Sequence, residues 1–385
     1  MKYFLILTII LKFNFGVAAT NLDLNDVSIL MPLPPVNQWS QLLDGTRAGP
    51  KGPLLPLSYL KSLPQILGLA TNEQIYPILH VVALRIDPCF SEGFTPSGCR
   101  PQIRMIWQPL AENDDTTTTF DASLHSFYEL SRAEFGSLVQ ELSQLKAAQT
   151  STIESQALSI NPYLKLNGLE SPFAKKLFEI VLNHAGESNL SRITFMQLFL
   201  NGNIWQFGGV DISHQKDGQT RLSEIKIPGT DVTLQQFRNN AKPNPTYFSG
   251  GPSPIPNLNA EFSFLLFDSR AISLPQSEKE ISDAVRAAYR IENPNLNNPG
   301  TVDCVSCHTA QAAKVWALTH FESLNLPAKN TDVIFNSDRN LNNISPSQDQ
   351  TNNLRAFGYF LDQPISSQRT INESAEVVRQ INLLF

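Results

Sequence analysis

The sequence contains few of the side chains that bind metals or act as nucleophiles. Its 385 residues include four cysteines, six histidines and four methionines. After the N-terminus, no stretch approaches the roughly 18 consecutive apolar residues that a membrane-spanning helix needs. The sequence has no Gly-x-Ser-x-Gly, His-Glu-x-x-His or phosphate-loop pattern, so the hydrolytic and nucleotide-dependent chemistries that use them are not expected. The net charge of −6, with no basic patch, gives no sign of nucleic-acid binding.

The N-terminus has the pattern of a secretory signal peptide. Lys2 precedes a mostly apolar run, and Val17 and Ala19 are small residues at the −3 and −1 positions of a cleavage site. The alternative is an uncleaved membrane anchor, but the run is short and Lys12 interrupts it. We therefore expect cleavage of residues 1–19, a periplasmic or secreted location, and no membrane span in the mature chain.

A C-x-x-C-H pattern, formed by Cys304, Cys307 and His308, is the strongest chemical signal in the sequence. This spacing is used for covalent attachment of c-type haem. Each thiol adds to one vinyl group of a single porphyrin, and the adjacent imidazole reaches the iron from one face. Residues 309–321 contain no proline or glycine and are predicted to form the helix that covers one haem edge.

Closely spaced cysteines also occur in zinc half-sites, in thioredoxin-like dithiols and in plain disulfides. A zinc site would need a second ligand pair at matching spacing, and none lies nearby in the sequence. A thioredoxin-like dithiol directly follows a strand, whereas residues 294–303 are typical of a loop. The sequence therefore favours one covalently bound haem c, attached at Cys304 and Cys307, with His308 as the proximal iron ligand.

At these three residues the sequence resembles the c-type cytochromes. The resemblance covers the motif and the helix after it, about 20 of the 385 residues. It implies two thioether bonds and a bond from His308 to iron. The sequence departs from the small His/Met cytochromes c, whose methionine ligand follows the motif, because its methionines, Met1, Met31, Met105 and Met196, all precede it. It also departs from the four-helix-bundle cytochromes, whose motif lies close to the chain end.

The sixth iron ligand is left open by the sequence. His320 is on the same helix as His308 and cannot easily reach the opposite haem face. The candidates upstream of residue 300 are Met105, Met196, His80, His125, His184 and His214. Alternation along the strands favours a core position for both methionines. An open sixth position would favour small-ligand binding or peroxide chemistry over simple electron transfer.

The two remaining cysteines are predicted to form a disulfide. Cys89 and Cys99 flank a loop rich in glycine, proline and serine between two strand-like runs. Disulfides form in exported proteins, and closing so short a loop is worth about 3 kcal/mol in the chain-entropy model.

The expected fold class is α+β. Antiparallel β meanders are each followed by an amphipathic helix, and a mostly helical haem-binding region forms the C-terminus. The expected segments are the signal peptide (1–19), a Pro- and Leu-rich extended arm (20–78), a first β meander with helices (79–186), a second β meander with a helix (187–292) and the haem-binding region (293–385). The shared order of strands and helix suggests a structural duplication.

Several elements have sequence signals for their ends. Ser131 and Glu134 form a capping box for a helix to about Lys146, and Ser171-Pro172 begins a second helix. The expected strands are 79–87, 102–110, 117–130, 191–200, 204–213, 220–227 and 260–268, with hairpin turns at Asn201-Gly202 and Asp217-Gly218. Ser277 and Thr370 are expected to cap two further helices.

These observations favour an exported, cytochrome-like protein with one haem that transfers electrons to a redox partner protein in the periplasm. The alternative is a peroxidase-like haem enzyme or a small-ligand sensor with an open or labile sixth position. No other catalytic constellation is visible, and the oligomeric state is not indicated by the sequence.

Overall fold

The structure is a computed structural model that describes residues 22–68, 70–91, 99–149, 156–198, 204–215, 219–226, 233–240, 247–249, 278–346, 348 and 354–384. The expected signal peptide, the two hairpin turns, Ser277 and the expected strand 260–268 lie outside these residues. The fold class is α+β, as expected from the sequence. Among the described residues, no helix is both long and apolar enough to span a membrane.

One ten-stranded antiparallel sheet forms the centre of the molecule. Its main path runs through β1 (Ser28–Leu30), β4 (Leu79–Ser91), β5 (Cys99–Asn113), β7 (Ala122–Glu129), β8 (Leu190–Leu198), β9 (Ile204–His214), β11 (Leu234–Asn240) and β12 (Tyr247–Ser249). In addition, β6 (Thr116–Thr119) pairs with β5, and β10 (Thr220–Glu224) pairs with β9. The expected strand 117–130 is thus two strands, because β6 pairs with the end of β5 and the chain then turns into β7.

The two expected β meanders belong to this single sheet. β7 of the first meander pairs with β8 of the second over most of their lengths. The expected boundary between residues 186 and 187 therefore falls between two hydrogen-bonded strands. The helices that follow the two meanders join different apolar clusters, so the second block does not repeat the packing of the first.

The N-terminal arm is more regular than the sequence suggested. It contains α1 (Leu24–Val27), β1, η1 (Val36–Gln41), β2 (Ala48–Gly49), β3 (Gly52–Pro53), α2 (Leu57–Lys61), α3 (Asn72–Ile75) and η2 (Tyr76–Ile78). β1 pairs with β4, and Leu22, Leu24 and Val27 are fully buried. The scattered leucines of this segment are packed in the main core, which orders the backbone between them.

The capped helices of the first block are confirmed. α4 (Arg132–Ala147) begins with the predicted capping box, and its five predicted apolar residues, Phe135, Leu138, Val139, Leu142 and Leu145, are buried. α6 (Pro172–His184) begins after Ser171, whose hydroxyl accepts a hydrogen bond from the Ala174 amide. The connection before it, expected to be irregular, contains the short helix α5 (Pro162–Asn167), and η4 (Glu187–Asn189) follows α6.

The C-terminal region is mostly helical. It contains α8 (Glu278–Glu292), α9 (Cys304–His320), η7 (Glu322–Leu324), α10 (Leu326–Lys329), the hairpin β13 (Phe357–Phe360) and β14 (Gln363–Ser366), and α11 (Gln368–Leu384). The hairpin was not predicted. The last helix begins earlier than Thr370, because the Thr370 amide donates to the Ser367 hydroxyl at 3.2 Å and Ser367 is therefore the capping residue.

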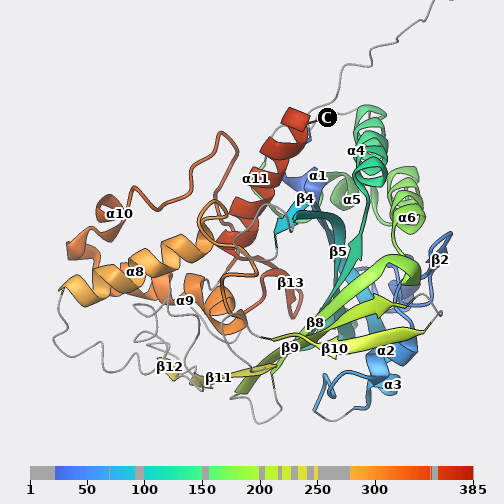
Figure 1. Ribbon diagram of the computed structural model, residues 1–385, viewed down its shortest axis with the longest axis horizontal. Coiled ribbons are helices and arrows are strands. Elements are labelled where there is room, and N and C mark those ends of the chain that lie inside the picture. The colour runs from blue at the N-terminus through green and yellow to red at the C-terminus, as the bar shows by residue number, and fades with distance from the viewer. Residues whose placement is uncertain are drawn as a thin grey trace, which may run out of the picture.

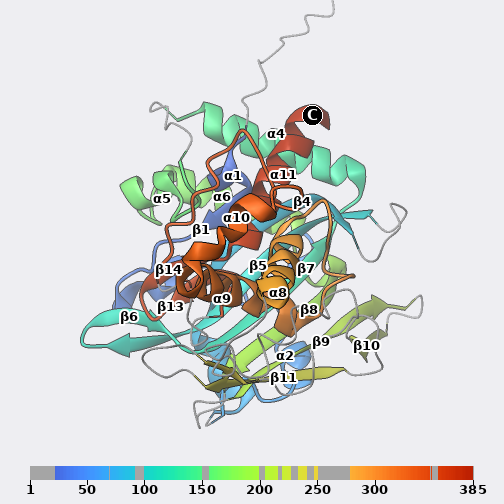
Figure 2. The ribbon, with the colours of Figure 1, turned by 90° about the vertical axis from the view of Figure 1, so that its left-hand side faces the viewer.

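The helices form layers on the two faces of the sheet. In Figure 1, α4, α5 and α6 lie to the upper right of the sheet, and α8 and α9 lie to its left. Figure 2, turned by 90°, places α8 and α9 in front of β5, β7 and β8. The main core includes α4 and α6, whereas α8 and α9 form a second apolar cluster with Met196, Trp205 and Phe207 of β8 and β9. The C-x-x-C-H motif therefore lies on a helix that faces the sheet.

The structure contains the disulfide between Cys89 and Cys99 that the sequence predicts. It joins β4 to β5 across a connection of sequence separation 10. Replacing Cys89 and Cys99 by serine should lower the free energy of unfolding by about 3 kcal/mol, because the unfolded chain regains the freedom of that loop. Denaturant titration of the variant and the wild type measures this loss. Two free thiols in the unfolded, unreduced wild-type protein would contradict the prediction.

Candidate functional site

A cavity of about 390 Å³ lies between one face of the sheet and the helices α9 and α11. Cavities of this size are typical of sites for organic ligands and cofactors. Apolar side chains from the sheet make up much of the wall, including Phe90, Ile106, Phe127, Phe195, Met196 and Phe207. Cys304, Cys307 and His308 line the opposite side, so the three motif residues open onto one cavity.

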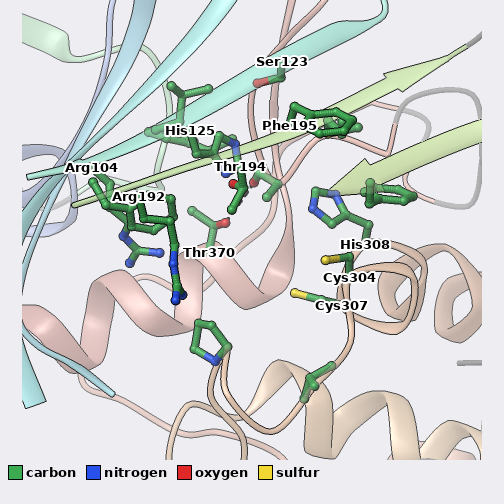
Figure 3. Close-up of a pocket in the computed structure, with 18 of the residues that line it drawn as sticks. Arg104, Ser123, His125, Arg192, Thr194, Phe195, Cys304, Cys307, His308 and Thr370 are labelled. Atoms are coloured by element: carbon green, nitrogen blue, oxygen red, sulfur yellow. Dashed lines mark hydrogen bonds between the residues drawn. The ribbon is translucent and has the colours of Figure 1, made fainter. Parts of the chain in front are cut away.

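The two thiols of the motif point into this cavity from the first turn of α9 (Figure 3). Cys304 and Cys307 are not joined to each other. Burial raises the pKa of Cys304 to about 12 and also raises the pKa of Cys307. Catalytic dithiols depend on a thiol with a lowered pKa. The surroundings of this pair are therefore unlike those of a thioredoxin-type redox site.

The start of α9 is fixed to the sheet by a polar clamp. The Asp303 carboxylate caps the helix by accepting a hydrogen bond from the Ser306 amide at 3.2 Å. Gln235 of β11 donates to Asp303 at 3.2 Å and accepts from the Val305 amide at 2.9 Å. Burial raises the pKa of Asp303 to about 6. These contacts set the position of both thiols relative to the sheet.

Replacing Gln235 by alanine should therefore destabilise the protein. The change removes one donor and one acceptor at buried partners, which costs about 1–3 kcal/mol. Unfolding by denaturant measures the loss. Gln236→Ala is the control, because Gln236 is the next residue of the same strand and is less buried than Gln235. Equal effects of the two substitutions would contradict the clamp.

The His308 imidazole is held in place by a hydrogen bond from one of its two ring nitrogens. Its Nδ1 donates a hydrogen bond to the Leu354 carbonyl oxygen at 2.6 Å. The ring packs against Phe207, with 5.0 Å between the ring centroids. Burial lowers the pKa of His308 and so favours the neutral ring. A neutral imidazole that uses Nδ1–H in this way keeps the lone pair of Nε2 free, which is the usual arrangement of a histidine that binds a metal.

The Leu354 carbonyl is itself fixed by the next residue. Arg355 is buried and forms an ion pair with Asp121, in the connection between β6 and β7. Its guanidinium also lies over the rings of Trp205 and Phe360, 5.5 Å and 5.1 Å from their centroids. The orientation of His308 is thus tied to the sheet through Arg355.

Of the six candidates for a second iron ligand, His125 and Met196 line the cavity. Met105 is fully buried in the main core, as alternation predicts. His184 contacts Glu141 at 2.9 Å, and His214 contacts the Leu190 carbonyl oxygen at 3.3 Å. His80 is buried where the N-terminal segment meets the sheet, since it pairs with Asp44 in an isolated bridge.

His125 lies on β7 at the centre of the sheet wall. Ser123, His125 and Phe127 alternate onto the cavity face, while Leu124, Ser126 and Tyr128 enter the core behind. Figure 3 shows His125 reaching into the cavity from the sheet, across from His308. Burial, followed by the nearby His308, Arg104 and Arg85, lowers the pKa of His125 to about 3. The imidazole is therefore neutral at physiological pH.

A row of arginines crosses the same face of the sheet. The strand register aligns Arg85 with Arg104, Arg104 with Phe127, and Phe127 with Arg192. This row lies two residues along the strands from His125, about 7 Å away. All three guanidinium groups line the cavity. They were not predicted as site residues from the sequence, although a charged side chain at an inward position of an apolar strand is a signal of function.

Glu373 of α11 balances part of this charge. Its carboxylate lies 2.6 Å from Arg369, 3.1 Å from Arg85 and 3.8 Å from Arg104. Although burial opposes its ionisation, these three guanidinium groups hold the pKa of Glu373 at about 2. Asp87 pairs with Arg104 at 3.2 Å. Within this cluster, the guanidinium groups of Arg85, Arg104 and Arg369 thus face the two carboxylates of Glu373 and Asp87.

The residues that line the cavity include each type of group that a haem c would need. Covalent attachment of haem would require two thiols at the edge of the ring, and its iron would require a neutral imidazole as a ligand. The porphyrin ring would require apolar walls, and the two propionates would require cationic hydrogen-bond donors. Buried Nε of Arg104 and the hydroxyl of Ser123 have no hydrogen-bond partner within the described residues, and both side chains line the cavity. By contrast, no cluster of three or more His, Cys, Asp or Glu side chains in the described ranges is arranged to bind a bare metal ion.

Among the aromatic residues of the C-terminal tail, Phe357 differs in its position from Tyr359 and Phe360. Phe357 lines the cavity. The Tyr359 hydroxyl instead donates to the Met31 carbonyl oxygen at 2.5 Å in the main core, and Phe360 packs against Arg355.

Comparison of the chain with family models, with curated proteins and with solved structures gave no match.

Proposed function

We propose that this protein carries one covalently attached haem c in the cavity between β7 and α9, and that it transfers electrons. The observation that carries the proposal is the common orientation of the motif side chains. Two thiols and an anchored imidazole face one largely apolar cavity from the first turns of a single helix. Neither a zinc half-site nor a structural disulfide needs the apolar space that lies in front of these three side chains.

Each part of the cavity wall has a role in holding this group. Cys304 and Cys307 would supply the two thioether sulfurs, and His308 would supply the proximal nitrogen. Arg104 lines the cavity, and its buried Nε, which has no hydrogen-bond partner within the described residues, is a donor for a propionate. Arg192, which is paired with Asp211, and Arg369, which is paired with Glu373, add positive charge to the same wall. The phenylalanine-rich wall would shield one side of the haem from water, which would lower the local dielectric and influence the reduction potential.

When bound, haem supplies reversible one-electron chemistry. The protein then has to hold the iron ligands in nearly the same positions in both oxidation states. The hydrogen bond from His308 to Leu354 and the clamp at Gln235 serve this purpose, because both fix the motif helix to the sheet. Electron transfer through a partly buried haem requires a redox partner protein at the cavity mouth, and export would place this exchange in the periplasm.

The proposal is tested by expressing the full-length chain in a bacterium with and without its haem c maturation machinery. We expect the exported protein to retain haem after denaturing electrophoresis only in the competent host, with one haem per chain. The pyridine haemochrome spectrum and a protein assay give this ratio. Exported, folded protein that carries no covalent haem in the competent host would overturn the proposal.

The alternative is a haem enzyme or sensor that uses an open sixth position. The observation in its favour is the placement of His125 and Arg104 on the wall that faces the motif, where they could act on a bound small molecule. The spin state of the wild-type iron separates the two functions.

A further inference from the structure

We propose that His125 is the second axial ligand, so that the iron is held between His308 of α9 and His125 of β7. This inference rests on the proposed haem attachment and adds the residue that the sequence left open. It places the two iron ligands on separate layers of the fold, one on the motif helix and one on the central sheet.

The positions of the two histidines carry the inference. Thioether bonds to Cys304 and Cys307 would hold the porphyrin against the start of α9, with His308 on one face of the ring. A ligand for the other face has to come from the wall across the cavity. Figure 3 shows His125 on that wall, facing the side of the cavity that holds His308. In the strand register, His125 lies between Ile106 and Thr194. Ile106 has no donor atom and Thr194 has a shorter side chain, so His125 is the residue of these three that can donate to iron.

The other candidate on this wall is less suited to bind iron. Met196 is only 3% exposed, and it belongs to the apolar cluster that contains Trp205 and Phe207. Binding of its sulfur to iron would take it from contacts with this cluster. The His125 imidazole is half-buried, and it makes no hydrogen bond within the described part of the chain. Its ring nitrogens are not fully buried, so they can be reached from the cavity.

The surroundings of His125 also differ from those of an acid–base catalyst. No side chain among the described residues orients His125 by a hydrogen bond, as an acid–base histidine usually requires.

The spin state of the iron tests the inference. The wild-type holoprotein, purified in the ferric and ferrous forms, should be six-coordinate and low-spin in absorption and electron paramagnetic resonance spectra. His125→Ala should keep its covalent haem on a denaturing gel and lose the low-spin signal. Added imidazole should restore it, because the substitution leaves space for a free imidazole on the sheet wall.

Control variants separate this effect from a general disturbance. Met196→Leu and His214→Ala should keep the wild-type spectra. If His125→Ala does not fold, His125→Met provides the second variant. It should remain low-spin, show near-infrared bands of an imidazole–thioether pair, and raise the reduction potential.

Two results would overturn the inference. One is wild-type iron that is high-spin and five-coordinate. The other is a low-spin signal that survives in His125→Ala or is lost in Met196→Leu. A wild-type protein without covalent haem is a different outcome, since it contradicts the proposed attachment itself.

Discussion

Replacing both Cys304 and Cys307 by alanine should abolish the haem that survives denaturing electrophoresis. Both thiols face the cavity from the first turn of α9, and each can form one thioether bond. With neither thiol present, any haem in the cavity would be held by coordination and contacts alone and would be lost on denaturation. Each single variant should retain covalent haem through one bond, with lower occupancy.

The matched control uses the other two cysteines. Replacing Cys89 and Cys99 by serine removes the disulfide between β4 and β5 but leaves the motif intact. This variant should stain for haem like the wild type. Persistent covalent haem in the Cys304/Cys307 double variant would show that the motif is not the attachment site.

Glu373→Gln should be the most destabilising conservative substitution at the cavity. The carboxylate lies between Arg369, Arg85 and Arg104, which are all buried. Removal of its charge leaves the three guanidinium groups with Asp87 alone, and breaking a buried ion pair in this way costs about 3–5 kcal/mol. Glu376→Gln, on the same helix, is the control. Glu376 pairs with a single guanidinium, that of the largely exposed Arg379, so its substitution should cost less than that of Glu373.

The effect of Glu373 should depend on pH. Its pKa is about 2 in the folded protein and close to 4.5 in the unfolded chain, so the ionised carboxylate stabilises the fold above the unfolded value. This stability is lost as the pH falls from about 4.5 through about 2. The difference between wild type and Glu373→Gln, measured by denaturant unfolding, should therefore shrink between about pH 5 and about pH 2. A difference that is constant over this range would contradict the role of the ion pairs.

The local signals in the sequence predicted much of the fold. The capping box at Ser131 and the apolar spacing from Phe135 to Leu145 indicated α4 because both are properties of one short segment. The disulfide followed from two cysteines on either side of one loop. The N-terminal arm was not predicted, since β1 exists only through pairing with β4 and its leucines are buried by elements far along the chain.

The candidate site shows the same division between local and long-range information. The motif indicated Cys304, Cys307 and His308 because their spacing is itself the chemical requirement. The opposite wall depends on strand pairing: Arg85, Arg104 and Arg192 become neighbours only through the register of four strands. Alternation along β7 groups Ser123, His125 and Phe127 on one face, but it does not say which face α9 covers.

The central claim is the covalent bond between haem and both motif cysteines, and mass spectrometry of the tryptic peptide 291–314 tests it most directly. This peptide contains Cys304, Cys307 and His308 and ends at Lys314. From exported wild-type protein made in a maturation-competent host, we predict that the peptide carries the mass of one haem and has no free thiol. The same peptide recovered with two free thiols, or with a disulfide between Cys304 and Cys307, would contradict the proposed attachment.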